Sequence, residues 1–195
     1  MAQVGEDDIH DDELTPGYKP PAEKSLDEII SADSNDESLR RYKEQLLGAT
    51  VTNLCPFPEN PKRVIVEKMS LLVEGRPDIE VDLTGDLKAL KKESFILKEA
   101  TQYRVKIYFY VQREIVPGLK YTQTSYRKGI KVDKTTFMVG SYPPKMELQS
   151  YTSPIEETPS GMIARGSYTV KSVFLDDDSH RHLEWEWTLE IKKDW

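Results

Sequence analysis

The chain has 195 residues, of which 37% are hydrophobic, and a formal net charge of -7. An acidic chain of this composition argues against nucleic-acid binding, and no apolar run approaches the roughly 20 residues that a membrane-spanning helix needs. The single cysteine, Cys55, cannot form an internal disulfide, and the acidic N-terminus lacks the basic region of a signal peptide. We therefore expect a cytosolic protein that does not insert stably into membranes.

Residues 1–61 are predicted to form an acidic, flexible arm and linker. Up to Leu47 there are 13 acidic residues against 5 basic ones, so this segment carries the negative charge of the whole chain. Residues 1–61 contain only three aromatic residues, too few to offset the entropy of ordering. Three prolines between residues 56 and 61 indicate a linker that leads into the rest of the chain.

Two short helices are predicted in the arm, near residues 25–31 and 36–47. Each follows a capping-box spacing, Ser25 with Glu28 and Ser34 with Glu37. In the second helix Leu39, Tyr42 and Leu46 share one face. Helices this short are marginal alone in water, so they either pack on their own domain or fold against a partner.

Residues 62–195 are predicted to form an all-β domain. Alternating apolar and polar residues predict strands near 64–73, 79–81, 94–97, 103–111, 119–126, 137–142, 162–174 and 183–191. In the last of these, Leu183, Trp185, Trp187, Leu189 and Ile191 fall on one face. Many short strands with no long helix between them predict an antiparallel β-sandwich.

The sequence contains no motif that would indicate catalysis. There is no nucleophile elbow, phosphate-binding glycine loop or metal-ligand spacing, so we expect neither an enzyme nor a metal or cofactor. Asp176 to Asp178 are interpreted as a solvated turn rather than a calcium site. The face that carries Trp185 and Trp187 is either a filled core or an apolar slot for a lipid, and the pattern leaves both open.

Several segments together resemble the Rho GDP-dissociation inhibitor family, from about Tyr18 to the last residue. These segments are Asp36–Lys43, Asp82–Leu87, Tyr126–Gly129, Met138–Tyr142, Ala164–Tyr168 and Trp185–Trp195. The resemblance implies an immunoglobulin-like β-sandwich with a regulatory N-terminal arm. It also implies a monomer that forms a 1:1 complex with a prenylated Rho-family small GTPase, preferably in the GDP-bound form.

In such a protein the arm clamps the switch regions of the GTPase and blocks GDP dissociation, while the sandwich holds the geranylgeranyl group and so extracts the GTPase from membranes. The resemblance assigns residues to four roles. The switch-binding residues are Asp36, Leu39, Tyr42, Leu46 and Asp178. The prenyl pocket comprises Leu71, Phe95, Val170, Trp187 and Leu189. Asp133, Glu156 and Glu157 bind the basic tail of the GTPase, and phosphorylation is expected at Tyr18, Ser25, Ser94 and Ser167.

Two other functions are compatible with a β-sandwich of this kind. One is a general solubilising carrier for prenylated or acylated proteins, without specificity for GTPases. The other is an adhesion or scaffolding module whose core is filled by its own side chains. The helix expected at 36–47 favours the GTPase regulator, because a general carrier does not need it.

Overall fold

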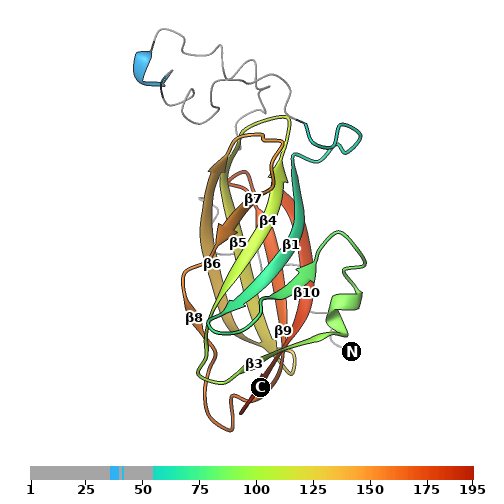
Figure 1. Ribbon diagram of the computed structural model, residues 1–195, viewed down its shortest axis with the longest axis vertical. Coiled ribbons are helices and arrows are strands. Elements are labelled where there is room, and N and C mark those ends of the chain that lie inside the picture. The colour runs from blue at the N-terminus through green and yellow to red at the C-terminus, as the bar shows by residue number, and fades with distance from the viewer. Residues whose placement is uncertain (1–35, 40, 42–54) are drawn as a thin grey trace.

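The computed structural model describes residues 36–39, 41 and 55–195, which contain two five-stranded β-sheets packed face to face (Figure 1). The first sheet has the strand order β2-β1-β4-β7, with β8 also paired to β4, and the second has the order β3-β10-β9-β5-β6. The first sheet comprises β1 (Val64–Val73), β2 (Ile79–Asp82), β4 (Gln102–Val111), β7 (Gln149–Thr152) and β8 (Glu156–Glu157). The second comprises β3 (Ser94–Lys98), β5 (Val116–Arg127), β6 (Ile130–Tyr142), β9 (Gly166–Leu175) and β10 (Arg181–Lys192).

The core lies between the two sheets and is formed by alternate residues of their strands. In β4 the four residues Val105, Ile107, Phe109 and Val111 have no exposed surface, and their neighbours along the strand are partly exposed. β10 contributes Trp185, Trp187, Leu189 and Ile191 from the opposite sheet. These are inward positions that the alternating pattern predicts, so the β-sandwich is confirmed.

One strand pairing differs from a purely antiparallel sandwich. β3 lies parallel to β10, with Ser94 opposite Thr188 and Phe95 opposite Leu189. The chain crosses from β2 in the first sheet, through a short 3-10 helix at Ala89–Lys91, to the edge of the second sheet. It arrives running in the same direction as β10, so the second sheet is mixed.

Two predicted strand boundaries also change. The segment predicted as a strand from residue 162 becomes β9 only at Gly166, because Ala164 and Arg165 donate their N–H groups to the carbonyl of Gly161 in a turn. Gly166 has a φ of 126°, which favours glycine, and the strand begins there. The strand predicted near 137–142 extends back to Ile130, and β7 and β8 were not predicted.

The linker residues that precede β1 are hydrogen-bonded to the sandwich through Gln112, a fully buried residue that follows β4. Its Oε1 accepts a hydrogen bond from the N–H of Phe57 at 3.1 Å and from Sγ of Cys55 at 3.3 Å. Its Nε2 donates to the carbonyls of Asn60 and Lys62 at 2.8 and 2.7 Å. Gln112 thus uses both ends of its amide to fix residues 55–62 on the sandwich.

The described part of the arm is the start of a helix. Asp36 accepts hydrogen bonds from the N–H groups of Ser38 and Leu39 at 2.9 and 3.1 Å, which is the geometry of an N-cap. Residues 37–39 and 41 are helical, and Arg41 pairs with Glu37 at 2.7 Å. Tyr18, Ser25, Tyr42, Leu46 and the helix near 25–31 lie outside the described residues. Within the described part, no helix is long and apolar enough to cross a membrane.

Candidate functional site

The five apolar residues assigned to the prenyl pocket meet in the core between the two sheets. Val170 of β9 lies opposite Trp187 of β10, and Phe95 of β3 lies opposite Leu189. Leu71, on β1 of the other sheet, belongs to the same core cluster. The rings of Phe95 and Trp187 meet edge to face with centroids 6.0 Å apart. The structure therefore brings all five into one apolar region.

This region is filled by its own side chains. Leu71 is fully buried, Val170 and Trp187 are each 2% exposed, and Leu189 is 7% exposed. Protein interiors of this kind have few voids larger than a water molecule. A lipid chain can enter only if the two sheets or their side chains move apart, so the arrangement resembles a closed slot.

A chain of buried polar side chains leads out of the apolar region from Trp187. Its indole Nε1 donates to Oγ of Ser172 at 3.0 Å, and Ser172 is 3.0 Å from the hydroxyl of Tyr121. Tyr121 in turn donates to Oε1 of Gln123 at 3.3 Å. Burial raises the pKa of Tyr121, so its hydroxyl stays protonated and available as a donor. These groups connect three adjacent strands of the second sheet.

The polar chain ends at Glu156, at the edge between the sheets. Gln123 donates its Nε2 to Oε2 of Glu156 at 2.5 Å, and the hydroxyl of Tyr103 donates to the same oxygen at 3.3 Å. Burial is the main cause that raises the pKa of Glu156, and the negative charge of Asp133 adds to it. The other oxygen, Oε1, is buried without a hydrogen-bond partner among the described residues.

Of the three carboxylates assigned to the basic tail, Glu156 and Asp133 act on each other electrostatically, whereas Glu157 is an exposed neighbour on β8. A cavity of about 310 Å³ is lined by Tyr103, which donates to Glu156, and by Ile155, but none of the three carboxylates lines it. A half-buried carboxylate with one unpaired oxygen favours a cationic donor. The site can therefore hold an ammonium or guanidinium group next to an apolar region.

The acidic turn between β9 and β10 lies at the opposite end, beside the linker. Asp176 is 2% exposed and contacts Nε2 of His182 at 3.0 Å and Arg63 at 3.6 Å, so the interpretation of this residue as part of a solvated turn is wrong. Asp177 pairs with Lys120 at 3.1 Å. Asp178 is half-buried, and its carboxylate has no hydrogen bond or ion pair within the described ranges. It remains available to a partner.

The two phosphorylation positions that the structure describes are both on the surface. Ser94 begins β3 and Ser167 lies near the start of β9, and both are exposed. No group of three or more metal-binding side chains occurs in the described part of the chain. Ser172, Tyr121, Gln123 and Tyr103 were not identified from the sequence. The signal that could have found them is a serine and a glutamine at inward positions of otherwise apolar strands.

Comparison with known proteins assigns the chain to a family. A family model described as RHO protein GDP dissociation inhibitor matches residues 3–194. The chain belongs to the Rho GDP-dissociation inhibitor family. Members of this family are regulatory inhibitors and not enzymes, in agreement with the prediction from the sequence.

Individual relatives agree with this assignment. The chain is 52% identical over 196 residues to Rho GDP-dissociation inhibitor 1 of Homo sapiens, covering 100% of this chain and 94% of the relative. It is 48% identical over 185 residues to Rho GDP-dissociation inhibitor 3 of Homo sapiens, covering 94% and 81% respectively. A solved Niemann-Pick type C2 protein from the Japanese carpenter ant covers 74% of this chain and 100% of its own, with a TM-score of 0.44 and 8% identity, too weak a likeness to carry an argument.

Proposed function

We propose that the chain is a cytosolic GDP-dissociation inhibitor that binds prenylated Rho-family small GTPases, preferably with GDP, as a 1:1 complex. Residues 62–195 hold the geranylgeranyl group, and residues 1–61 form the arm that contacts the switch regions and blocks nucleotide release. The complex removes the GTPase from the membrane. Family membership supports this function as a whole, and the residues of the site support the individual roles.

The proposal rests on a chain of hydrogen bonds that links the apolar region to a carboxylate. Trp187 lies among the assigned lipid-binding residues and is connected through Ser172, Tyr121 and Gln123 to Glu156. A prenylated GTPase ends in a basic segment followed by a hydrocarbon chain. An apolar slot with a carboxylate at its edge matches those two parts in order.

Hydrocarbon burial alone does not move the GTPase off the membrane. Each CH₂ group gains about 0.8 kcal/mol whether it leaves water for a bilayer or for an apolar slot, so transfer between the two is nearly neutral. Opening the filled core around Leu71 and Trp187 adds a cost, since those side chains lose contacts as they separate. Contacts with the protein part of the GTPase must supply the free energy that offsets the opening of the core and favours the complex over the membrane.

The switch contacts are the source of that additional binding energy. Asp36 caps the arm helix through one carboxylate oxygen, Oδ1, which leaves Oδ2 for a partner. Leu39 is 41% exposed and offers an apolar contact from the same helix. Asp178 supplies a second carboxylate from the β9–β10 turn. Binding that favours one conformation of the switches also favours retention of GDP, because a ligand shifts populations through differential affinity.

Phosphorylation at Ser94 and Ser167 is proposed to weaken the complex. Both side chains are exposed to a kinase, and a phosphate adds close to two negative charges at neutral pH. Ser167 lies opposite Glu190 on β10, so the added charge increases repulsion on that surface. Tyr18 and Ser25 are the corresponding positions proposed in the arm.

The decisive experiment is extraction from liposomes of a geranylgeranylated, GDP-loaded Rho-type GTPase. The full chain is compared with a chain that begins at residue 55, because the structure fixes residues 55–62 to the sandwich through Gln112. We expect efficient extraction by the full chain and weak extraction by the shortened one, with both binding a geranylgeranylated basic peptide.

Other outcomes distinguish the alternatives. Equal extraction by both chains favours a general prenyl-protein carrier, because the arm then contributes nothing. Failure of both chains to bind the geranylgeranylated peptide contradicts a lipid slot and favours a filled scaffold. The unprenylated GTPase serves as the control for binding that does not need the lipid.

A further inference from the structure

One end of the sandwich presents a patch of exposed apolar side chains that the proposed site does not use. We call this group the apolar tip: Ile130 and Val132 of β6, with Met162 and Ile163 of the loop between β8 and β9. Their exposed fractions are 70%, 51%, 82% and 88%. Single exposed apolar residues are common, but a group of them indicates an interaction surface. The loop forms the lower end of the molecule in Figure 1, away from the linker.

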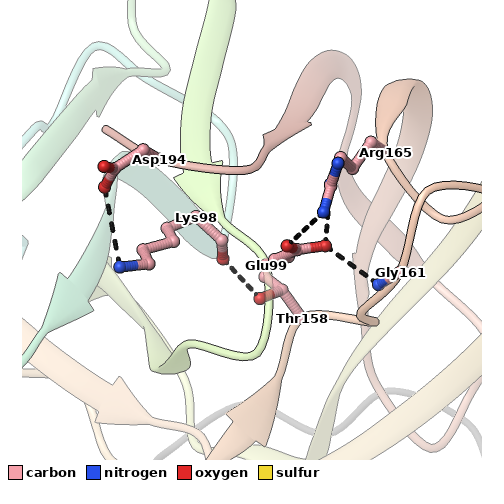
Figure 2. A network of polar contacts seen from close by, with 6 residues as sticks. All are labelled: Lys98, Glu99, Thr158, Gly161, Arg165 and Asp194. Atoms are coloured by element: carbon pink, nitrogen blue, oxygen red, sulfur yellow. Dashed lines mark hydrogen bonds and ion pairs between the residues drawn. The ribbon is translucent and has the colours of Figure 1, made fainter.

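The loop is held in place by polar contacts, as Figure 2 shows. Glu99 accepts two hydrogen bonds from Arg165, at 2.9 and 2.7 Å, and a third from the N–H of Gly161 at 2.9 Å. Thr158 donates to the carbonyl of Lys98 at 2.6 Å and so fixes the start of the loop. Met162 and Ile163 are therefore presented by an anchored loop rather than by a loose one.

Arg127 joins the two halves of the tip. It lies opposite Ile130 in the β5–β6 pair, and its guanidinium donates to the carbonyls of Ile163 and, at 2.7 Å, of Arg165. Tyr168 also donates to the carbonyl of Ala164 at 2.6 Å. These bonds satisfy the backbone carbonyls of Ile163, Ala164 and Arg165, while the apolar side chains of Met162 and Ile163 stay exposed.

Cationic side chains flank this apolar surface. Lys128 and Lys131 are exposed on the β5–β6 hairpin, on either side of Ile130, and make no ion pair among the described residues. Lys128 has a φ of 50° and Gly129 a φ of 81°, so the tight turn fixes the direction of the hairpin end. Glu99 is already engaged by Arg165. In a chain with a net charge of -7, Lys128 and Lys131 thus place two positive charges beside the apolar tip, and Asp133, directly after Val132, places one negative charge there.

We propose that the apolar tip docks on the surface of a bilayer that contains anionic phospholipids. Met162 and Ile163 enter the headgroup region, while Lys128 and Lys131 contact the anionic headgroups. Long apolar side chains between lysines are the combination that binds such surfaces, and the lysines make binding depend on lipid charge. A protein partner of the same patch would bind without lipid, and this difference is used in the test.

The location gives docking a role in the proposed function. Val132 directly precedes Asp133 on β6, and Asp133 acts electrostatically on Glu156. The tip therefore places the acidic edge of the slot near the membrane, where a prenyl group and its basic tail are found. This role rests on the proposed function, whereas membrane binding by the tip is measured independently of it.

The test is vesicle flotation with the full chain. Vesicles of phosphatidylcholine with about 30% phosphatidylserine are compared with phosphatidylcholine alone. We expect binding to the anionic vesicles that falls about fivefold or more in Lys128→Glu/Lys131→Glu and in Met162→Ser/Ile163→Ser. The matched control is Met146→Ser, which changes another methionine, 57% exposed, in the β6–β7 connection. It should bind as the unchanged chain does.

Three results of the flotation assay overturn the inference. The first is that the unchanged chain does not bind anionic vesicles. The second is that the unchanged chain and both double variants bind the two kinds of vesicle equally. The third is that Met146→Ser loses as much binding as the double variants do. Circular dichroism of each variant excludes unfolding as the reason for a loss. Self-association or binding of another protein in the absence of vesicles, without flotation, assigns the patch to a protein partner and also overturns docking.

A second measurement separates this inference from the proposed function. Affinity for the geranylgeranylated GTPase is measured in solution without vesicles, and extraction is measured from anionic vesicles. We expect the tip variants to keep their solution affinity and to extract severalfold more slowly. If the unchanged chain does not bind the prenylated GTPase, the proposed function fails, but flotation still decides whether the tip binds lipid.

Discussion

Trp187 and Ser172, on adjacent strands, form a buried hydrogen bond of 3.0 Å from the indole Nε1 to the serine Oγ. Ser172 has no exposed surface and also contacts the hydroxyl of Tyr121. A serine hydroxyl has one proton and two lone pairs, so it serves both partners at once. This small side chain thereby sets the orientation of the large indole at the centre of the proposed slot.

Replacement of Ser172 by Ala should lower the free energy of unfolding by about 1–3 kcal/mol. The change leaves the indole N–H of Trp187 buried without an acceptor, which costs its desolvation. Equilibrium denaturation in urea measures the effect. Thr169→Ala, at an exposed position of the same strand, is the control and should change stability by less than about 0.5 kcal/mol. Equal effects in the two variants would show that the buried bond contributes nothing.

Replacement of Glu156 by Gln should raise stability near neutral pH and weaken binding of the basic tail. Burial raises the pKa of Glu156 in the folded state, so the unfolded state releases this proton at a lower pH. The free energy of unfolding therefore decreases as the pH rises from the ordinary pKa of a glutamate to the raised pKa. Glu156→Gln has no carboxyl group to titrate at this position, so its free energy of unfolding does not decrease in this pH range. Thermal unfolding from about pH 4 to pH 8 measures the slope, and a geranylgeranylated basic peptide measures the affinity.

Glu157→Gln provides the control for this prediction, because Glu157 is the exposed neighbour on the same short strand. It should leave the pH dependence of unfolding unchanged. A loss of stability in Glu156→Gln at neutral pH, with peptide affinity unaltered, would contradict both parts of the argument.

Two variants of Asp36 separate its two roles in the arm. Asn caps helices about as well as Asp, whereas Ala loses about 1 kcal/mol of cap energy. If the carboxylate binds a switch region, Asp36→Asn and Asp36→Ala should both weaken GTPase binding about tenfold or more, since bonds to charged groups contribute about 1.5–3 kcal/mol. Calorimetric titration with the prenylated GTPase measures this. Near-normal affinity of the Asn variant would restrict Asp36 to capping.

Replacement of Gln112 by Leu should lower the free energy of unfolding by about 2–4 kcal/mol. The side-chain volume is nearly kept, but the N–H of Phe57 and the carbonyl of Lys62 lose their partner, and the carbonyl of Asn60 keeps only its bond from Arg113. Limited proteolysis should also cut faster between residues 55 and 62. Gln102→Leu, on the exposed start of β4, is the control. Unchanged proteolysis in Gln112→Leu would mean that other contacts hold the linker.

Mild acid should destabilise the protein through His182 and Asp176. Burial lowers the pKa of His182. Burial opposes ionisation of Asp176, but its hydrogen bonds from His182 and from the N–H of His180 outweigh this and lower its pKa. Arg63 and His180 face the pair and add to the lowering of the pKa of His182. Both groups bind protons more readily in the unfolded chain, so stability falls as the pH drops below about 6.5.

The variant that tests this effect is His182→Gln, which keeps a donor for Asp176 but does not titrate. Its melting temperature should fall less than that of the unchanged chain between about pH 7 and pH 5. His180→Gln, at an exposed position, should keep most of the original slope. A slope in His182→Gln equal to that of the unchanged chain would assign acid sensitivity to other groups.

The alternating pattern predicted the inward faces of β4 and β10 well, because buried residues alternate with more exposed ones along each of these strands. It did not predict β7 or β8, which are short and bordered by prolines. Nor did it indicate the parallel pairing of β3 with β10. Periodicity reports which side of a strand is buried, but not which strand lies next to it.

The candidate site was likewise predicted only in part. The resemblance assigned Leu71, Phe95 and Trp187 to one region, and the structure places them together. The polar chain through Ser172 and Gln123 depends on neighbours in adjacent strands, which a single sequence does not display. Asp176 was misinterpreted for a similar reason. Its partner His182 lies six positions away across a turn, and the contact appears only once β9 and β10 pair.

The position of β10 has a consequence for how the protein folds during its synthesis. β10 is the last strand in the chain, yet it lies inside the second sheet between β3 and β9 and provides both buried tryptophans of the core. β3 is synthesised early but has no neighbour in its sheet until β10 emerges from the ribosome. Long-range pairing of this kind folds slowly and exposes apolar strands meanwhile. Nascent chains should therefore depend on chaperones until β10 has been synthesised, and a stop codon before β10 should yield an aggregating fragment rather than a smaller domain.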